Sequence, residues 1–296
     1  MDIRSTLSRR GFAGALTATG LFSAKAAAAA PSKATETVTL GKSGVQVTRL
    51  AQGTGWNGSA RSSAHTRLGE KAFQSLIRHD IDHGVTFMDS ADLYGSHPYL
   101  RNALRGVPRE KYTVLTKIWP RTEFWNAYSG GAKAEVDRFR KEFATDYLEV
   151  VLLHCLMNDR WTDEFKRAMD DMAELKQKGV VKAVGVSCHD FGALKVAAAS
   201  PWTDVLLVRI NNVGKAAAMD ATVEEVVPVI KQAKAAGKGI IGMKIFGAGK
   251  LTQPEQRDAS LKFVFQNNLV DAVTIGMMSE AEVTDTMARI DKAMAG

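Results

Sequence analysis

The chain has 296 residues, of which 45% are hydrophobic and 24% are charged. This composition is typical of a folded globular protein and excludes a collagen-like fibre, a disordered tail and an integral membrane protein. Two cysteines, Cys155 and Cys188, are too few for a disulfide framework or a four-thiolate metal site. The net charge is +7, but no basic run follows the first thirty residues, so nucleic acid is not expected as a partner.

Residues 1–30 have the features of an export signal. Arg9 and Arg10 precede a mildly apolar stretch over residues 13–24, and an alanine-rich segment follows over residues 26–30. The apolar stretch is shorter than the roughly 20 residues of a bilayer-spanning helix, so no stable membrane insertion is expected. The paired arginines resemble the twin-arginine signal, whose machinery exports folded proteins. We therefore expect cleavage within residues 26–30 and a periplasmic or otherwise exported protein; the alternative is an unstructured N-terminal extension.

From residue 36 onward, short apolar runs alternate with amphipathic stretches. Two runs at 37–40 and 45–48, joined by a glycine-bearing turn, predict a β-hairpin. Near-continuous apolar runs suit strands buried on both faces. Eight such strands are predicted at 50–53, 85–88, 112–116, 148–153, 181–186, 205–210, 240–243 and 272–275. Helices are predicted at 68–83, 132–144, 163–178, 223–236 and 279–294, with weaker ones at 99–104 and 191–199.

Eight strand–helix units predict one α/β domain over residues 31–296, a (β/α)8 TIM barrel with a short N-terminal β-hairpin. A doubly wound open sheet is the alternative architecture. Such a sheet normally carries a glycine-rich fingerprint after its first strand. The residues after the first predicted strand here, Gly53-Thr54-Gly55-Trp56, do not match that fingerprint.

Polar side chains gather at the C-terminal ends of the predicted strands, where barrel enzymes carry their chemistry. Asp89 and Tyr94 follow the second strand, Lys117 ends the third, and His154 ends the fourth. This set can deliver a proton to a carbonyl oxygen, because a nearby ammonium would lower the pKa of the tyrosine toward neutrality. Asp89 would keep the lysine charged, and His154 would orient the carbonyl. Further polar residues at strand ends are Ser187, Cys188, His189, Arg209, Asn211 and Lys244.

These residues, in this register, resemble the aldo-keto reductases. The family's aspartate, followed five residues later by tyrosine and then glycine, matches Asp89, Tyr94 and Gly95. Its strand-three lysine and strand-four histidine match Lys117 and His154. The resemblance extends from about residue 39 to the C-terminus. It implies that NADPH or NADH lies across the barrel mouth and that hydride passes to an aldehyde or ketone. Tyr94 would then be the proton donor, with the other three side chains in support.

The resemblance also implies which residues contact the cofactor. The family's asparagine after the strand-five serine is replaced here by Cys188, and its strand-six glutamine by Leu207. Glu282 stands near the position of the basic residue that binds a 2′-phosphate. An acidic side chain repels a phosphate but can accept from a ribose hydroxyl, so the choice between NADPH and NADH stays open. The predicted contacts are Gly53, Thr54, Ser187, Cys188, Lys244, Phe246, Gly247, Gly249 and Lys250; no metal ligands are predicted.

Two other functions remain open from the residues alone. One is a barrel that binds nicotinamide or another small ligand with little turnover. The other is a lyase or isomerase that uses the same tyrosine–lysine–histidine cluster without redox change. The sequence does not name the carbonyl substrate, although four aromatic residues lie on loops where they would line a pocket: Trp56, Trp119, Phe124 and Trp125.

The two cysteines allow either a disulfide or free thiols. Cys155 and Cys188 follow adjacent predicted strands, and neighbouring strands lie about 4.8 Å apart, which is close enough for a bridge. An oxidising compartment would favour that bridge. A small buried thiol beside a functional residue is the alternative.

Overall fold

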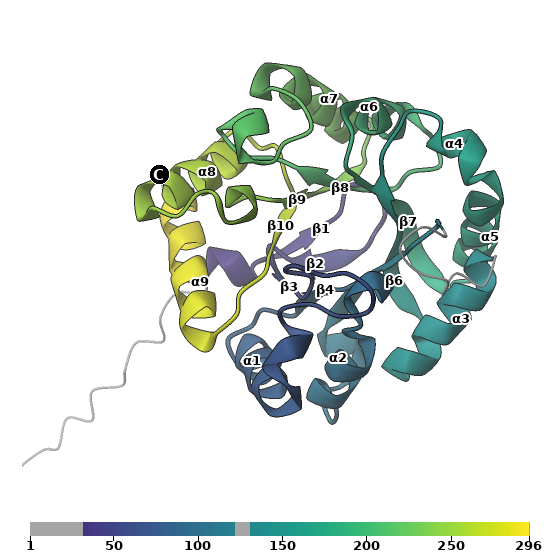
Figure 1. Cartoon of the computed structure of the whole chain (residues 1–296), viewed down its shortest axis with the longest axis horizontal. Helices are drawn as coiled ribbons and strands as arrows, with labels where there is room; N and C mark the ends of the chain where they lie inside the picture. The colour runs from purple at the N-terminus through teal and green to yellow at the C-terminus, as the bar shows by residue number, and fades with distance from the viewer. Residues whose placement is uncertain (1–31, 122–130, 296) are drawn as a thin grey trace, which may run out of the picture. The chain divides into compact units, whose positions relative to one another are not determined.

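A computed structural model describes residues 32–121 and 131–295. Within these ranges eight parallel strands close into a barrel, in the order β10-β3-β4-β5-β6-β7-β8-β9 (Figure 1). The predicted (β/α)8 fold is therefore confirmed, and the doubly wound open sheet is excluded. The strands are β3 (Leu50–Gly53), β4 (Phe87–Asp89), β5 (Thr113–Ile118), β6 (Leu148–Leu156), β7 (Val181–Cys188), β8 (Val205–Arg209), β9 (Gly239–Met243) and β10 (Ala272–Ile275).

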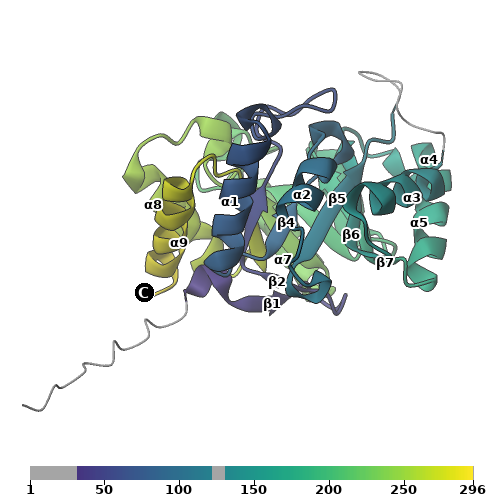
Figure 2. The same ribbon diagram turned by 90° about the horizontal axis from the view of Figure 1, so that it is seen from below.

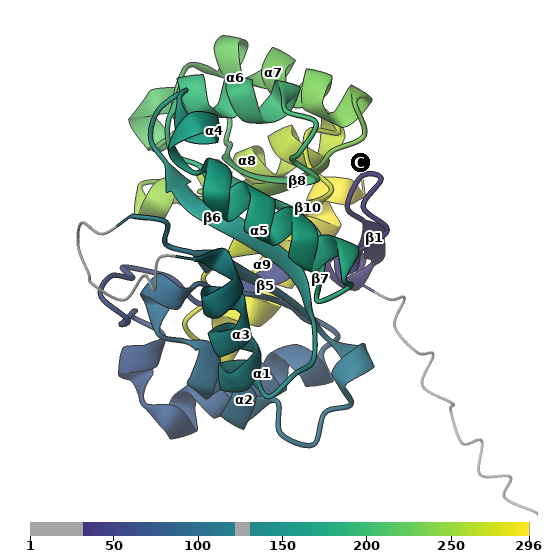
Figure 3. The same ribbon diagram turned by 90° about the vertical axis from the view of Figure 1, so that its right-hand side faces the viewer.

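Helices surround the barrel wall, and α3 and α5 lie side by side on its outer face (Figure 3). One of these helices, α8, was not among those predicted from the sequence. No helix in the described part of the chain is both long and apolar enough to span a membrane. The helices are α1 (Glu70–Asp82), α2 (His97–Ala103), α3 (Ala132–Phe143), α4 (Trp161–Glu164), α5 (Lys166–Gln177), α6 (Phe191–Ala199), α7 (Val223–Ala235), α8 (Pro254–Gln266) and α9 (Glu280–Met294).

Strands β6 and β7 run further than their apolar residues predict. The predicted strands end at residues 153 and 186, but pairing continues to Leu156, which lies opposite Cys188, after an irregularity in register. Cys155 takes a left-handed backbone conformation at this irregularity, with φ 57°. The extension places His154 and Ser187 within paired strands, so the barrel wall fixes their positions.

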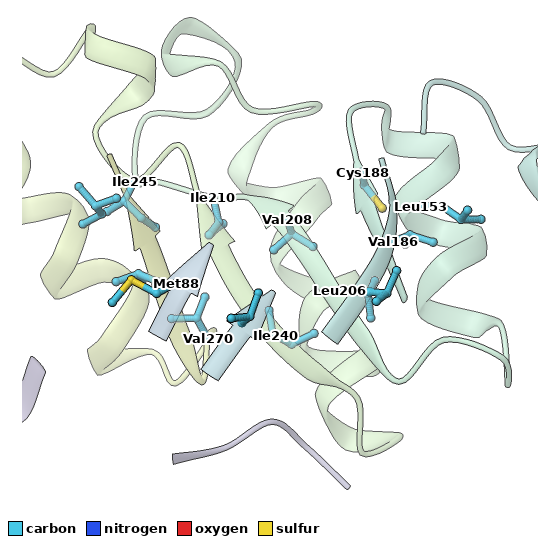
Figure 4. Close-up of a cluster of buried hydrophobic side chains, with 14 of the residues drawn as sticks. Met88, Leu153, Val186, Cys188, Leu206, Val208, Ile210, Ile240, Ile245 and Val270 are labelled. Atoms are coloured by element: carbon cyan, nitrogen blue, oxygen red, sulfur yellow. The ribbon is translucent and has the colours of Figure 1, made fainter. Parts of the chain in front are cut away.

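Side chains of the barrel strands alternate between two hydrophobic cores. The inner core fills the barrel and includes Phe87, Leu115 and Leu152. The outer core lies between the strands and the helices, and Figure 4 shows part of it, with Leu206 and Val208 among its labelled residues. Because each strand is covered on both sides, apolar residues occupy nearly every position along it.

The predicted hairpin is present, as β1 (Thr37–Thr39) paired antiparallel with β2 (Gln46–Thr48). Figure 2 shows it at the foot of the barrel, and Leu40 from its turn and Val47 from β2 join the inner core. Gly41 in the turn has φ 51°, and a Cβ there would lie 2.3 Å from the carbonyl oxygen of Gly237. A glycine is therefore required where the hairpin seals the barrel.

Candidate active site at the mouth of the barrel

The four predicted catalytic residues come together at the C-terminal end of three adjacent strands. Asp89 is the last residue of β4, Lys117 is the next-to-last of β5, and His154 lies near the end of β6. Tyr94 belongs to a short 3-10 helix, Asp92–Tyr94, that follows β4. Because β4, β5 and β6 are neighbours in the barrel, their side chains meet at one edge.

Lys117 and Asp89 form a buried ion pair. Lys117 is 1% exposed, and its ammonium donates to Asp89 Oδ1 and to the carbonyl oxygen of Ser90, the latter at 2.7 Å. The second carboxylate oxygen of Asp89 accepts from Thr274 Oγ1 at 2.7 Å. Buried charges are tolerated when opposite charges and hydrogen bonds satisfy them, so this pair holds a charged lysine inside the mouth.

Tyr94 is held by glycines on both sides. Gly95 ends the 3-10 helix with φ 66°, and a Cβ there would lie 2.0 Å from the carbonyl oxygen of Arg61. A Cβ on Gly55 would lie 2.3 Å from the Tyr94 ring, so the missing side chain leaves room for that ring. Gly55 lies in the loop after the first barrel strand, where its sequence context alone does not indicate a contact with Tyr94.

The electrostatic environment of Tyr94 differs from the one expected. Burial raises the pKa of Tyr94 well above its usual value, and the charges of Asp89 and Cys155 raise it further. The Lys117 ammonium lies 4.9 Å from the centre of the phenol ring. The expectation that this lysine lowers the pKa of Tyr94 is therefore wrong for this structure. The phenol keeps its proton at neutral pH, which is the state that a proton donor needs.

His154 is buried and uncharged. Burial, followed by the positive charge of Lys117, lowers the pKa of His154 well below its usual value. Its Nε2 lies 3.3 Å from the Tyr94 hydroxyl, and Trp119 packs edge-on against the ring at 5.7 Å between centroids. Its Nδ1 is buried without a hydrogen-bond partner among the described residues. A neutral imidazole beside the phenol can take part in one hydrogen-bond network with an incoming carbonyl oxygen.

A cavity of about 330 Å³ opens beside Tyr94 and Asp89. Four of the predicted cofactor contacts line it: Gly53, Lys244, Phe246 and Gly249. Leu207 and Met243 add apolar surface to its wall, while Glu282, Asp285 and Arg257 add charged groups. Of the expected aromatic residues, Trp56 lines this cavity and Trp119 contacts His154. Phe124 and Trp125 lie outside the described residues.

Five predicted cofactor contacts do not line the cavity. Thr54 Oγ1 bonds to the carbonyl oxygen of Asp89 and to Ser96 Oγ, both at 2.9 Å. Ser187 Oγ accepts from the backbone N–H of Cys155 at 2.9 Å. The remaining three are Gly247, which is buried in the loop after β9, Lys250, which is exposed and donates to a backbone carbonyl, and Cys188.

Cys188 points into the outer core, away from the cavity, where Figure 4 shows it near Val186. Ser187 and Cys188 are consecutive on β7, so their side chains lie on opposite sides of the barrel wall. The placement of Cys188 as a nicotinamide contact is therefore not supported.

The two cysteines do not form a disulfide in this structure: both are free, and Cys155 Sγ lies 3.5 Å from His189 Nε2.

Thr274 is a site residue that the sequence analysis missed. It lies on β10, lines the cavity and donates to Asp89. Its signal was a polar residue in the middle of an otherwise apolar predicted strand, Ala272–Ile275. Such a residue in a strand that is covered on both sides needs a polar partner inside the barrel.

Comparison with known proteins agrees with this architecture. The profile of the aldo/keto reductase family matches residues 50–292. The chain belongs to the aldo/keto reductase family. Among curated relatives, methylglyoxal reductase YeaE of Escherichia coli is 29% identical over 158 residues, which cover 51% of this chain and 49% of the relative. An aldo-keto reductase of Alternaria alternata is 25% identical over 227 residues, which cover 65% and 60%. The match thus spans about half to three-fifths of these relatives' lengths.

Solved structures share the fold of this aldo/keto reductase. A candidate aldo-keto reductase from Pseudomonas aeruginosa has a TM-score of 0.72 and 24% identity, covering 90% of this chain and 98% of its own. An aldo-keto reductase from Klebsiella pneumoniae, solved in complex with NADPH, has a TM-score of 0.63 and 19% identity. That match covers 86% of this chain and 89% of the Klebsiella chain.

Proposed function

We propose that this aldo/keto reductase reduces an aldehyde or ketone to an alcohol with NADPH or NADH, and that Tyr94 donates the proton. The observation that carries the proposal is the contact of a protonated phenol with the neutral His154, beside the buried Lys117–Asp89 pair, at the mouth of a cavity. The relative named as a methylglyoxal reductase and the Klebsiella structure with NADPH support the same chemistry.

The cavity residues fit an extended dinucleotide. The cavity wall combines the apolar side chain of Phe246, a glycine-bearing loop at Gly249, and charged groups such as Arg257 and Glu282. A Cβ on Gly249 would lie 3.0 Å from the Trp56 ring, so the glycine keeps this side of the cavity open. When bound, the cofactor supplies a hydride to the carbonyl carbon.

The residues of the chain supply the other half of the reaction. As the carbonyl carbon gains hydride, its oxygen gains negative charge and takes the proton of the Tyr94 hydroxyl. The charged Lys117 stabilises the resulting phenolate, and Asp89 keeps that ammonium in place. His154 holds the carbonyl oxygen next to Tyr94, and solvent returns the proton to the phenolate in the next turnover.

The test is a titration of the purified protein with NADPH and NADH, following the quenching of tryptophan fluorescence. Trp56 lines the cavity, so saturable quenching at micromolar concentrations is the expected result. Consumption of bound NADPH or NADH on addition of aldehydes then identifies the reductase. An absence of quenching would overturn the redox proposal. Product formation without cofactor would instead identify the lyase or isomerase.

We also propose that residues 1–30 are a twin-arginine export signal and that the mature protein is periplasmic or otherwise exported. The support is the sequence pattern of paired arginines before a short apolar stretch. Because free nicotinamide cofactors are scarce outside the cytoplasm, folding around the cofactor before export would supply it, and a second substrate would then have to recycle it in place. Replacing Arg9 and Arg10 by lysine should leave the precursor in the cytoplasm of fractionated cells. Unchanged export would contradict the signal.

A further inference from the structure

Lys244, one of the predicted cofactor contacts, brings into the cavity a charge that the proton transfer described above does not use. It follows β9 directly and lines the cavity together with Tyr94 and Asp89. It is partly buried, and its ammonium has no hydrogen bond or ion pair to any other described residue. Its backbone is left-handed, with φ 58°, a conformation that few residues other than glycine adopt. Because an unpaired charge is costly to bury, a lysine in this position favours the binding of an anion in the cavity.

Arg209 lies next to this lysine on the neighbouring strand. In the barrel register it pairs with Met243, the residue just before Lys244. Its guanidinium contacts Asp220 Oδ1 at 3.0 Å and His189 Nδ1, and its Nε is buried without a partner among the described residues. The guanidinium therefore keeps unused hydrogen-bonding capacity close to Lys244.

The three cations on this side of the barrel mouth, Lys117, Arg209 and Lys244, differ in whether they form ion pairs. Asp89 matches Lys117, and Asp220 matches Arg209. Lys244 has no such partner, and the nearby imidazoles of His154 and His189 are neutral. Burial lowers the pKa of both histidines, and the charges of Lys117, Lys244 and Arg121 lower it further. Of Lys117, Arg209 and Lys244, only Lys244 has no ion pair among the described residues, and it lines the same cavity as Tyr94.

We propose that Lys244 and Arg209 bind a carboxylate on the substrate, so that the preferred substrates are aldehyde or ketone acids. This inference rests on the proposed reductase function and names its substrate class. The ammonium supplies the charge, and the guanidinium supplies a fixed donor beside it. A neutral carbonyl of equal size would leave the Lys244 charge unmatched and would bind more weakly.

The test compares two aldehydes of equal size with the full-length protein: 4-carboxybenzaldehyde and its neutral amide, 4-formylbenzamide. The expected kcat/KM is at least tenfold higher for the acid. In Lys244→Met this ratio should fall about tenfold, which corresponds to about 1.4 kcal/mol. Lys244→Arg should keep most of it. Lys231→Met, at an exposed position on α7, is the matched control and should leave the ratio unchanged. The ratio compares two substrates of one protein sample, so partial loss of folded protein does not affect it.

Three results would overturn the inference. The first is a ratio near one in the unaltered protein. The second is a Lys244→Met variant in which kcat/KM falls equally for both aldehydes while NADPH and NADH bind more weakly. That result would mean that Lys244 binds the cofactor's phosphates. The third comes from a titration of 4-(hydroxymethyl)benzoate and its amide, followed by tryptophan fluorescence, in which the carboxylate shows no advantage. That titration needs no turnover, so it tests the anion site even if neither aldehyde is reduced and the reductase proposal fails.

Discussion

At the scale of single residues, the proposed chemistry depends on two side chains that burial keeps neutral and on one that forms a buried ion pair. Burial raises the pKa of Tyr94 and lowers the pKa of His154, so the phenol retains its proton and the imidazole carries no charge. Lys117 is also buried, and its ammonium pairs with the carboxylate of Asp89. The surroundings of each side chain, rather than its residue type, thus determine its protonation state, as is usual at sites where proton transfer occurs.

The substitution Tyr94→Phe removes only the hydroxyl and keeps the ring that packs against Gly55. We expect kcat to fall at least about 100-fold, because the general acid is lost, while the Kd for NADPH or NADH stays within about twofold. Tyr99→Phe is the matched control, since Tyr99 packs against Phe73 in the outer core. Near-normal turnover by Tyr94→Phe would exclude the phenol as proton donor.

Asp89, Lys117 and His154 could be found from the sequence because each follows an apolar run, which fixes its position along the barrel axis. Tyr94 was found from its spacing to Asp89. What the sequence did not reveal was the direction of side chains near irregular positions. Ser187 and Cys188 both seemed to face the site, but alternation along β7 sends one inward and the other into the outer core. The pKa direction of Tyr94 was missed because burial cannot be read from residue identity.

At the scale of elements, the short 3-10 helix that carries Tyr94 is tied to α3 by ion pairs. Arg138 on α3 donates to both carboxylate oxygens of Asp92, at 2.9 and 2.8 Å, and Arg61 donates to the same carboxylate at 2.7 Å. Burial raises the pKa of Asp92 to about 7 despite the opposing effect of Arg61. The network therefore holds a buried carboxylate, which is costly to desolvate, two residues before Tyr94, the proposed proton donor.

Arg138→Met should loosen this attachment. We expect the free energy of unfolding to fall by about 2 kcal/mol, because Asp92 loses a bidentate partner, and kcat to fall more than cofactor affinity. Arg140→Met on the same helix is the control, since the ion pairs of Arg140 with other described residues are looser, at 3.7 and 3.8 Å. Chemical unfolding and steady-state kinetics measure both effects. Equal losses in the two variants would show that the Asp92 network has no special role.

His65 joins the loop after β3 to the segment after β10, through Met277 and Gln52 at 3.0 and 3.3 Å. Burial lowers the pKa of His65 to about 4 from an ordinary value of 6.5. Below pH 6.5 His65 therefore binds a proton in the unfolded chain but not in the native state. As a result, the native state loses stability as the pH falls toward 4. The loss integrates to about 3 kcal/mol.

The variant His65→Gln lacks this titration. Its deficit in the free energy of unfolding relative to the unaltered protein should therefore shrink by about 3 kcal/mol between pH 7 and pH 4. Urea unfolding at intervals of one pH unit measures the deficit, with His83→Gln, at an exposed position, as control. A deficit that stays constant with pH would show that His65 takes up its proton as readily in the native state as in the unfolded chain.

The elements themselves were largely predictable, because strands covered on both sides must be apolar and barrel helices must be amphipathic. The predicted strands all have counterparts in the barrel, from β3 to β10. Helix α8 was missed because its polar and apolar residues are not separated into clear faces, so the periodicity of its sequence does not indicate a helix. The ends of β6 and β7 were placed too early because a polar residue, His154 or Ser187, interrupts each apolar run before the strand ends.

At the scale of the described barrel, one end is sealed and the other carries the site. The hairpin plugs the foot with Leu40 and Val47, while the cavity lies among the loops at the opposite end. The rigid wall positions Asp89, Lys117 and His154, and the loops supply Tyr94 and the cavity. This division lets the loops change substrate class without altering the proton-transfer residues.

Because the cavity contacts segments after several strands, a bound cofactor should stabilise the whole barrel. At a concentration 100 times its Kd, NADPH or NADH should add about 2.7 kcal/mol to the free energy of unfolding. Thermal unfolding with increasing cofactor measures this as a rise in Tm of several degrees. A Tm that does not depend on cofactor concentration would argue against a site formed in the native state.

The most direct test of the central claim is the fate of the hydride in a single turnover. The protein is mixed with one equivalent of NADPH or NADH that carries deuterium on the transferable position, together with an aldehyde substrate, and the product is analysed by mass spectrometry and NMR. The account predicts an alcohol with one deuterium on the former carbonyl carbon and a proton from solvent on its oxygen. A product without deuterium, or one formed equally well without the cofactor, would contradict it.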